Sequence, residues 1–122
     1  MLKVSEILSY ITEEAPLCWQ ESYDNSGLLI GDSNALVDKV LLSLDVTEEV
    51  IDEAINNSFH MIISHHPLIF KGVKNILADD AIGKMIMKAI KHEISIAAMH
   101  TNIDNSFYGV NHVLAEKLGL RD

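Results

Sequence analysis

The feature that most constrains this chain is the regular alternation of short apolar runs with helical patterns. Apolar and β-branched runs predict strands over 28–30, 39–45, 59–64 and 94–99. Apolar residues at helical spacing, bounded by capping or breaking residues, predict helices over 4–14, from Thr47, from Asp79 or Asp80 to 90, and over 110–118. Strands and helices that alternate in this way predict an α/β fold with a mostly parallel sheet and helices on both faces.

The 122 residues are expected to form a single α/β domain over residues 1–122. With 48% hydrophobic and 22% charged residues, the composition is that of a globular protein and not of a disordered one. The formal net charge of −9 leaves few cations to bind phosphates, so neither nucleic acid nor an anionic membrane is expected as a partner. The single cysteine, Cys18, excludes an internal disulfide and is expected to be a small, partly buried residue. These features predict a cytoplasmic protein.

Polar side chains follow three of the predicted strands at their carboxyl ends. Asp45 ends one strand, His65 and His66 follow the next, and His100 and Asp104 follow the last. Ligands of open α/β sheets bind beyond these ends. Because the carboxyl ends of parallel strands meet at one edge of a sheet, we expect these side chains to share one site.

Histidine and aspartate in this pattern are typical of a site for divalent cations. Adjacent strand residues point to opposite faces, but at a strand end before Pro67 both imidazoles can reach one cavity, which suits two close cations better than one. Asp104, four residues after His100, can bridge two cations with its two oxygens. Each motif alone also fits a solvated loop or a chance spacing. Their meeting at one edge favours metal binding.

Asp45 has two interpretations, since it either closes the turn before Thr47 or orients an imidazole or a bound water. The other histidines, His60, His92 and His112, are expected to be structural or surface residues. The glycines are not spaced as in a phosphate-binding loop, so a nucleotide P-loop is not predicted.

Two motifs carry a family resemblance, namely Ser64–Phe70 (SHHPLIF) and His100–Asp104 (HTNID). In this order and at this separation they resemble the dinuclear metal-centre proteins called Nif-three-like, which are also named GTP cyclohydrolase 1 type 2 homologues. Further matches are Asp24–Leu28, Leu44–Thr47, and Gly109–Asn111 with Leu114–Leu120. The resemblance runs from about Ile7 to Leu120.

What the resemblance implies is a cytoplasmic, metal-dependent hydrolase with two divalent ions, assembled as a toroidal homohexamer and acting on an unknown small molecule. On the matching positions, His65, His66 and Asp104 would be the metal ligands, with Asp104 as the bridge. His100 would line the site as an acid/base or water-positioning group. Ligands of these types suit zinc, iron, manganese or nickel.

The resemblance also implies a longer protein, because members of that family carry a further His-x-x-x-Glu pair near their C-terminus. The chain is therefore expected to represent the N-terminal half of such a protein, with an incomplete two-metal site. His112 and Glu116 have the same spacing but lie in the predicted last helix, and we interpret this as coincidence. Two alternatives stay open: a regulatory or scaffold protein whose metals are structural, and a metal-free, inactive domain.

Overall fold

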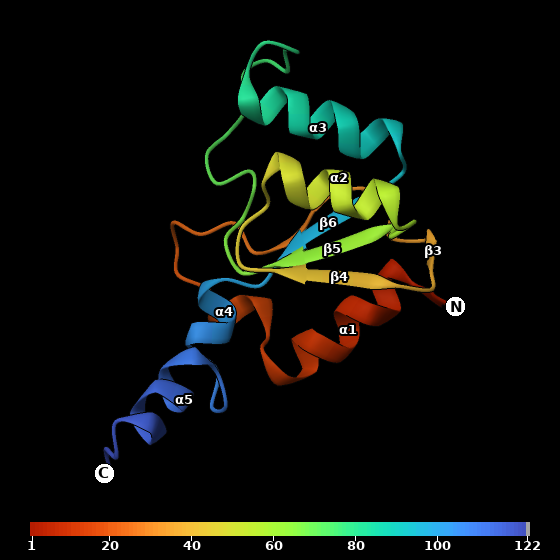
Figure 1. The fold of residues 1–122 in the computed structure, drawn as a ribbon. Helices are drawn as coiled ribbons and strands as arrows, with labels where there is room; N and C mark the ends of the chain where they lie inside the picture. The colour runs from red at the N-terminus through yellow and green to blue at the C-terminus, as the bar shows by residue number, and fades with distance from the viewer. Residues whose placement is uncertain (122) are drawn as a thin grey trace.

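Four strands form the central sheet of the computed structural model, which describes residues 1–121 (Figure 1). Their order across the sheet is β2 (Gly27–Ile30), β6 (Ser95–Ala98), β5 (Met61–Ser64) and β4 (Val40–Ser43). The β4–β5 and β5–β6 pairs are parallel, whereas β2 pairs with β6 in the antiparallel direction. The prediction of a mostly parallel sheet is confirmed, and the strand predicted over 28–30 is its antiparallel member.

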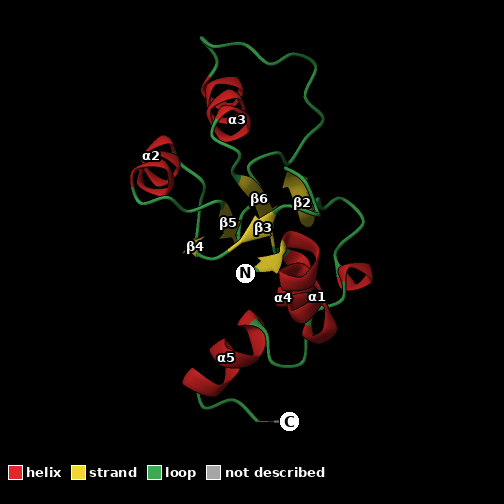
Figure 2. Cartoon of the chain, turned by 90° about the vertical axis from the view of Figure 1, so that its right-hand side faces the viewer, coloured by secondary structure: helices red, strands yellow, loops and turns green. Residues whose placement is uncertain are grey.

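Helices cover both faces of the sheet, as predicted. The helices α2 (Glu48–Asn56) and α3 (Ala81–Lys91) lie on one face, and α1 (Val4–Glu14) lies on the other (Figures 1 and 2). Successive residues of β5 therefore enter different cores, because side chains alternate along a strand. Ile62 packs in the cluster that contains residues of α2 and α3, while Met61 and Ile63 pack in the cluster with Val4 of α1.

Two of the helices begin at the capping residues that the sequence predicts. The hydroxyl oxygen of Thr47 accepts a hydrogen bond from the backbone N–H of Val50 at 3.2 Å. The carboxylate of Asp80 accepts one from the N–H of Gly83 at 2.9 Å, so Asp80 and not Asp79 caps α3. Each such cap contributes about 1 kcal/mol to stability.

Four short elements were not predicted. The strands β1 (Leu2–Lys3) and β3 (Leu36–Val37) form a separate antiparallel pair. The 3-10 helix η1 (Leu17–Trp19) and the helix α4 (Thr101–Asp104) lie where loops were expected. None of them exceeds four residues, which is too short to show a periodic pattern. Cys18 in η1 is exposed, so the expectation that it is partly buried was wrong.

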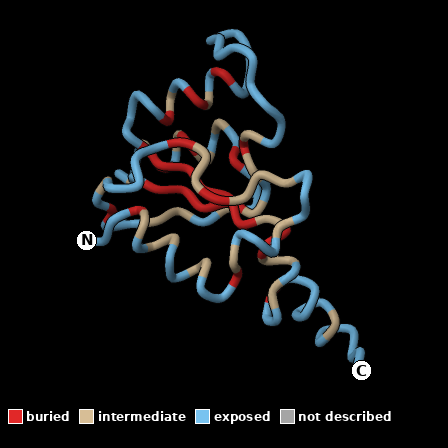
Figure 3. Tube along the Cα trace, turned by 180° about the vertical axis from the view of Figure 1, so that it is seen from behind, coloured by how far each residue is buried: buried red, intermediate tan, exposed pale blue. Residues whose placement is uncertain are grey.

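The last helix, α5 (Val110–Lys117), lies where it was predicted but makes few contacts with the rest of the chain. It extends away from the sheet toward the C-terminus and carries no buried residue (Figure 3). At the sheet edge, Leu42 of β4 is 73% exposed. Within residues 1–121, no helix combines the length and the apolar character that crossing a membrane requires.

Candidate metal centre

Three imidazoles meet where β5 and β6 end. Ser64 pairs with Ala98 in the parallel register, so His65 and His66 leave the sheet beside His100. One ligand atom of each of the three histidines lies within 4.8 Å of those of the other two. The ring centroids are 5.0, 5.1 and 5.4 Å apart. The expectation that the two histidine motifs share one edge of the sheet is confirmed by this geometry.

Each of these imidazoles is held through its Nδ1 atom. His65 Nδ1 lies 2.8 Å from the carbonyl oxygen of Met99, and His66 Nδ1 lies 2.7 Å from a carboxylate oxygen of Asp45. His100 Nδ1 lies 2.9 Å from Oδ1 of Asp24. A carbonyl or carboxylate oxygen can only accept, so each Nδ1 carries the proton and donates it. In the neutral ring Nε2 then holds the free lone pair, which is the form that binds a cation.

The buried carboxylate of Asp24 is the site residue that sequence reasoning missed. Its side chain is fully buried, and its oxygens accept hydrogen bonds from His100 Nδ1, from the N–H and hydroxyl of Thr101, and from the N–H of Asn25. Burial acts to raise the pKa of this carboxyl, but the hydrogen bonds from Thr101, His100 and Asn25 outweigh it and hold the pKa far below the ordinary value. Asp24 is therefore ionised and fixes the orientation of His100.

Asp45 takes the second of its two expected roles, because its carboxylate accepts the hydrogen bond from His66. The pair is exposed, with 49% of the histidine side chain and 57% of the aspartate side chain accessible. Asp45 therefore orients an imidazole, in the manner of the outer carboxylates that hold metal-binding histidines.

Asp104 lies at the border of the imidazole cluster. One carboxylate oxygen is 3.7 Å from Nε2 of His65. The helix α4 explains this position, since His100 precedes its first residue and Asp104 is its last, one helical turn later. Asp104 is not one of the three residues whose ligand atoms lie within 4.8 Å of one another, whereas His100 is. The structure thus places His100 with His65 and His66, and Asp104 beside them. That these residues bind metal stays a prediction.

The remaining histidines lie outside this cluster, in agreement with their expected structural or surface roles. His60, His92 and His112 are all exposed. His92 is the C-terminal cap residue of α3. His112 lies 3.3 Å from Glu116 within α5, so these two residues face one another on one helix.

The donor set of the cluster fits a divalent transition metal. Neutral imidazole nitrogens with a nearby carboxylate suit zinc, iron, manganese and nickel, which differ little in their preference for such ligands. A cation at the cluster would bind the lone pairs that the Nε2 atoms offer.

The sequence matches the Duf34/NIF3 (NGG1p interacting factor 3) family over residues 2–122. The chain belongs to this family. A NIF3 relative from Staphylococcus aureus, named GTP cyclohydrolase 1 type 2 homolog, is 46% identical over 99% of the chain. The chain spans about a third of the length of that curated relative, since the match covers 33% of it.

Solved structures show the same fold. The Bacillus cereus protein related to NIF3 is 48% identical, with a TM-score of 0.91 over 99% of this chain and 33% of that one. Reduced HcgD from Methanocaldococcus jannaschii is 30% identical, with a TM-score of 0.92 over 99% of this chain and 48% of that one. The predicted membership of the NIF3 family and the predicted fold are thus confirmed.

Proposed function

We propose that this chain is the metal-binding domain of a NIF3-family hydrolase that works with two divalent cations. The observation that carries the proposal is the convergence of three imidazoles, each with Nδ1 tied to an oxygen and Nε2 left for a ligand. In a chance cluster of surface histidines there is no reason for three separate oxygen atoms to accept a hydrogen bond from Nδ1 of each ring and so to select the same tautomer.

The proposed ligands are His65, His66 and Asp104, as the family resemblance implies. His65 and His66 offer one nitrogen each, and the two oxygens of Asp104 suit a bridge between cations. When bound, such cations supply Lewis acidity toward a water and toward a substrate oxygen. The residues of this chain hold the metal-binding nitrogens in place: Met99 orients His65, and Asp45 orients His66.

His100 has two proposed roles, and its place in the cluster favours one of them. The resemblance implies an acid/base group, but the ligand atom of His100 lies within 4.8 Å of those of His65 and His66. His100 is hydrogen-bonded through Nδ1 to the buried carboxylate of Asp24. In known metal centres a carboxylate commonly orients a metal-binding histidine in this way. We therefore propose that His100 is a third nitrogen ligand, with an acid/base role as the alternative.

The wider setting is proposed from the family resemblance. The full-length protein is proposed to be a cytoplasmic homohexamer that acts on a small molecule. Exposed apolar side chains such as Leu42 at the sheet edge and Leu114 on α5 support association with further protein surface.

The test is the zinc content of four purified proteins: the wild type, His65→Ala, Asp104→Ala and His112→Ala. We expect the wild type to bind zinc, the first two variants to lose most of it, and His112→Ala to keep it, because His112 lies outside the cluster. Equal zinc content in all four proteins would contradict the proposal. Far-UV circular dichroism of each variant separates lost binding from lost folding.

Catalysis is tested separately from binding. The full-length relative is screened against phosphoesters and nucleotides with zinc or manganese added, and after removal of metal by a chelator. Metal-dependent turnover supports the hydrolase and excludes a purely structural role of the metals. Metal binding without turnover of any substrate supports the scaffold alternative.

A further inference from the structure

Two exposed aromatic rings, those of Tyr23 and Phe70, lie next to the imidazole cluster. The ring of Phe70 lies between those of Tyr23 and His100, with centroid distances of 6.4 Å to Tyr23 and 6.3 Å to His100. Tyr23 is 65% exposed and Phe70 is 42% exposed. Other aromatic side chains, such as Tyr10 and Tyr108, are exposed too, so it is the position beside the candidate metal centre that sets these two rings apart.

Hydrogen bonds hold the two loops that carry these rings. The side-chain amide of Asn25 donates to the carbonyl oxygen of Ile69 at 2.7 Å and so joins the loop of Tyr23 to that of Phe70. Tyr23 also directly precedes the buried Asp24, whose carboxylate is anchored by several donors. Loops that are already joined lose little conformational freedom when a ligand binds, which favours affinity.

We infer that Tyr23 and Phe70 form a stacking corner for a planar, unsaturated ring of the molecule that reaches the imidazole cluster. The two rings meet at an interplanar angle of 68°, so they form a corner and not a parallel pair. In such an edge-to-face pair, the ring that presents its edge keeps both faces free for a flat ligand. A saturated ring of the same size gains no comparable contact, because it lacks a flat π-surface.

The protein charges near the corner have both signs, because the ionised Asp24 directly follows Tyr23 and Lys71 directly follows Phe70. A cation can also bind to an aromatic face. However, the divalent cations of the proposed function would lie beside His100 and would repel a cationic ligand. The ligand class is thus a flat, unsaturated ring that carries an acidic or neutral polar group toward the cluster.

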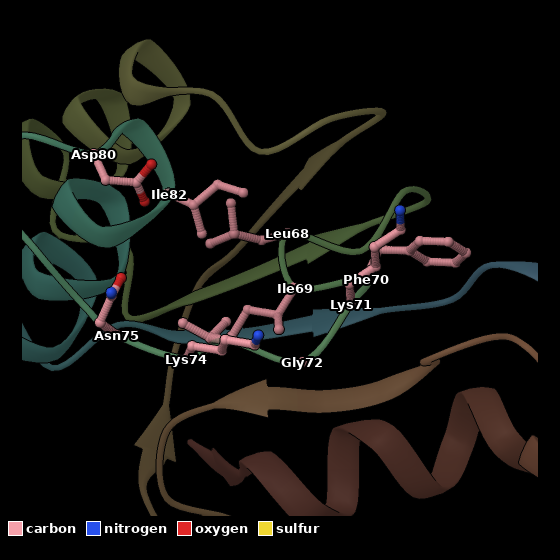
Figure 4. Close-up of a pocket in the computed structure, with 10 residues that line it drawn as sticks. Leu68, Ile69, Phe70, Lys71, Gly72, Lys74, Asn75, Asp80 and Ile82 are labelled. Atoms are coloured by element: carbon pink, nitrogen blue, oxygen red, sulfur yellow. The ribbon is translucent and has the colours of Figure 1, made fainter.

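The corner adjoins a hollow that the same loop lines. That hollow, of about 440 Å³, is lined by Phe70 itself and by residues such as Leu68, Ile69 and Ile82. In Figure 4 the ring of Phe70 points away from Ile82 and Asp80. The Phe70 ring therefore lies at the border of the hollow, on the side of His100.

The inference rests on the proposed function for the identity of the neighbouring site, and its test is read independently of metal binding. The probes are 2-naphthoate and its saturated counterpart, decahydro-2-naphthoate, titrated by NMR with and without zinc. We expect the wild type to prefer 2-naphthoate by roughly three- to tenfold in both conditions. The naphthoate protons are expected to move upfield, because they lie over aromatic rings.

Phe70→Leu keeps an apolar side chain but removes the ring, so we expect this variant to lose the preference and to bind zinc as the wild type does. Phe107→Leu is the matched control. Phe107 is another exposed aromatic residue in an edge-to-face pair, with Trp19 at 5.9 Å. This control is expected to keep the preference for the flat ring.

The inference is overturned if the wild type does not discriminate between the two acids, or if Phe70→Leu discriminates as well as the wild type. Failure of the proposed function looks different. A wild type that binds no zinc but still prefers 2-naphthoate, with the preference lost in Phe70→Leu, contradicts the metal site and supports the stacking corner.

Discussion

Replacement of Asp24 by asparagine gives the sharpest test of how the candidate centre is held. The two side chains have nearly the same shape, so the change removes a charge and one acceptor without opening a cavity. Oδ1 of Asp24 accepts from the N–H of Asn25 at 2.8 Å and from His100 at 2.9 Å. Oδ2 accepts from the N–H of Thr101 at 2.9 Å and from its hydroxyl. Whichever oxygen becomes an NH₂ group, at least one backbone N–H then faces a donor.

The size of the effect follows from these contacts. Loss of a hydrogen bond to a charged group costs about 1.5–3 kcal/mol, and an unsatisfied buried donor costs about 1–3 kcal/mol. We therefore expect Asp24→Asn to lower the free energy of unfolding by about 3 kcal/mol. For a chain of 122 residues this corresponds to a melting temperature lower by about 12 °C. Thermal and urea unfolding of the metal-free protein measure both quantities.

Asp45→Asn is the matched control, because it makes the same chemical change in the other aspartate–histidine pair. The Asp45 side chain is 57% exposed and accepts one hydrogen bond from His66, so we expect a loss below about 1 kcal/mol. Equal losses in the two variants, or an unchanged stability of Asp24→Asn, would refute the view that the buried carboxylate anchors the site.

The pH dependence gives an independent check on the same residue. The folded pKa of Asp24 lies below its unfolded value of about 3.9, so its contribution is complete above that value and is lost as the pH falls toward the folded pKa. We expect the stability difference between the wild type and Asp24→Asn to stay constant down to about pH 5 and to narrow from there toward about pH 3. A stability difference that widens on acidification would show that folding raises the pKa of Asp24 and does not lower it.

Two further predictions concern the scaffold around the centre. Lys88 of α3 donates to Asp52 and Glu48 of α2 at 2.6 and 3.0 Å; these bonds, the one to Asp52 foremost, raise the pKa of Lys88. The contribution of these ion pairs to stability is thus present at neutral pH and lost as the pH rises through the raised pKa of Lys88. Lys88→Met should lower the melting temperature more in low salt than in high salt, because salt screens the ion pairs. A loss that does not depend on salt would contradict an electrostatic link between the two helices. A Cβ on Gly109 would lie 1.7 Å from the carbonyl oxygen of Ile103, so Gly109→Ala should destabilise by about 1–3 kcal/mol in urea unfolding. Gly72→Ala, with no atom within 4 Å of its Cβ, should be close to neutral, and similar losses in the two glycine variants would contradict this reasoning.

The strands, the longer helices and the edge of the sheet that carries the site were predictable, because they follow from local sequence patterns. Periodicity located all four central strands and the longer helices, and their alternation implied the parallel pairs. Once β5 and β6 are parallel neighbours, the residues that follow them must emerge together. The meeting of His65 and His66 with His100 was therefore available from the order of elements alone.

The partners of the imidazoles were less accessible from the sequence. Asp24 lies 76 positions from His100, in a segment whose residues predicted only turn chemistry. No spacing rule links a loop near the N-terminus to a strand end near the C-terminus. The segment was part of the family resemblance, Asp24–Leu28, and that was the one available signal. The helix α4 was missed because four residues are too few for a helical period, and it is this helix that turns Asp104 back toward His65.

The parallel pairing of β5 with β6 also sets when, during synthesis, the chain can acquire its centre. His65 and the carbonyl of Met99 that orients it are 34 positions apart, and a parallel pair cannot form until the helix between them has emerged from the ribosome. Until then a nascent chain holds only two of the three clustered imidazoles, those of the neighbouring His65 and His66. Long-range pairings of this kind are the slow steps of folding. The three imidazoles are consequently brought together late, in a domain whose sheet is already formed.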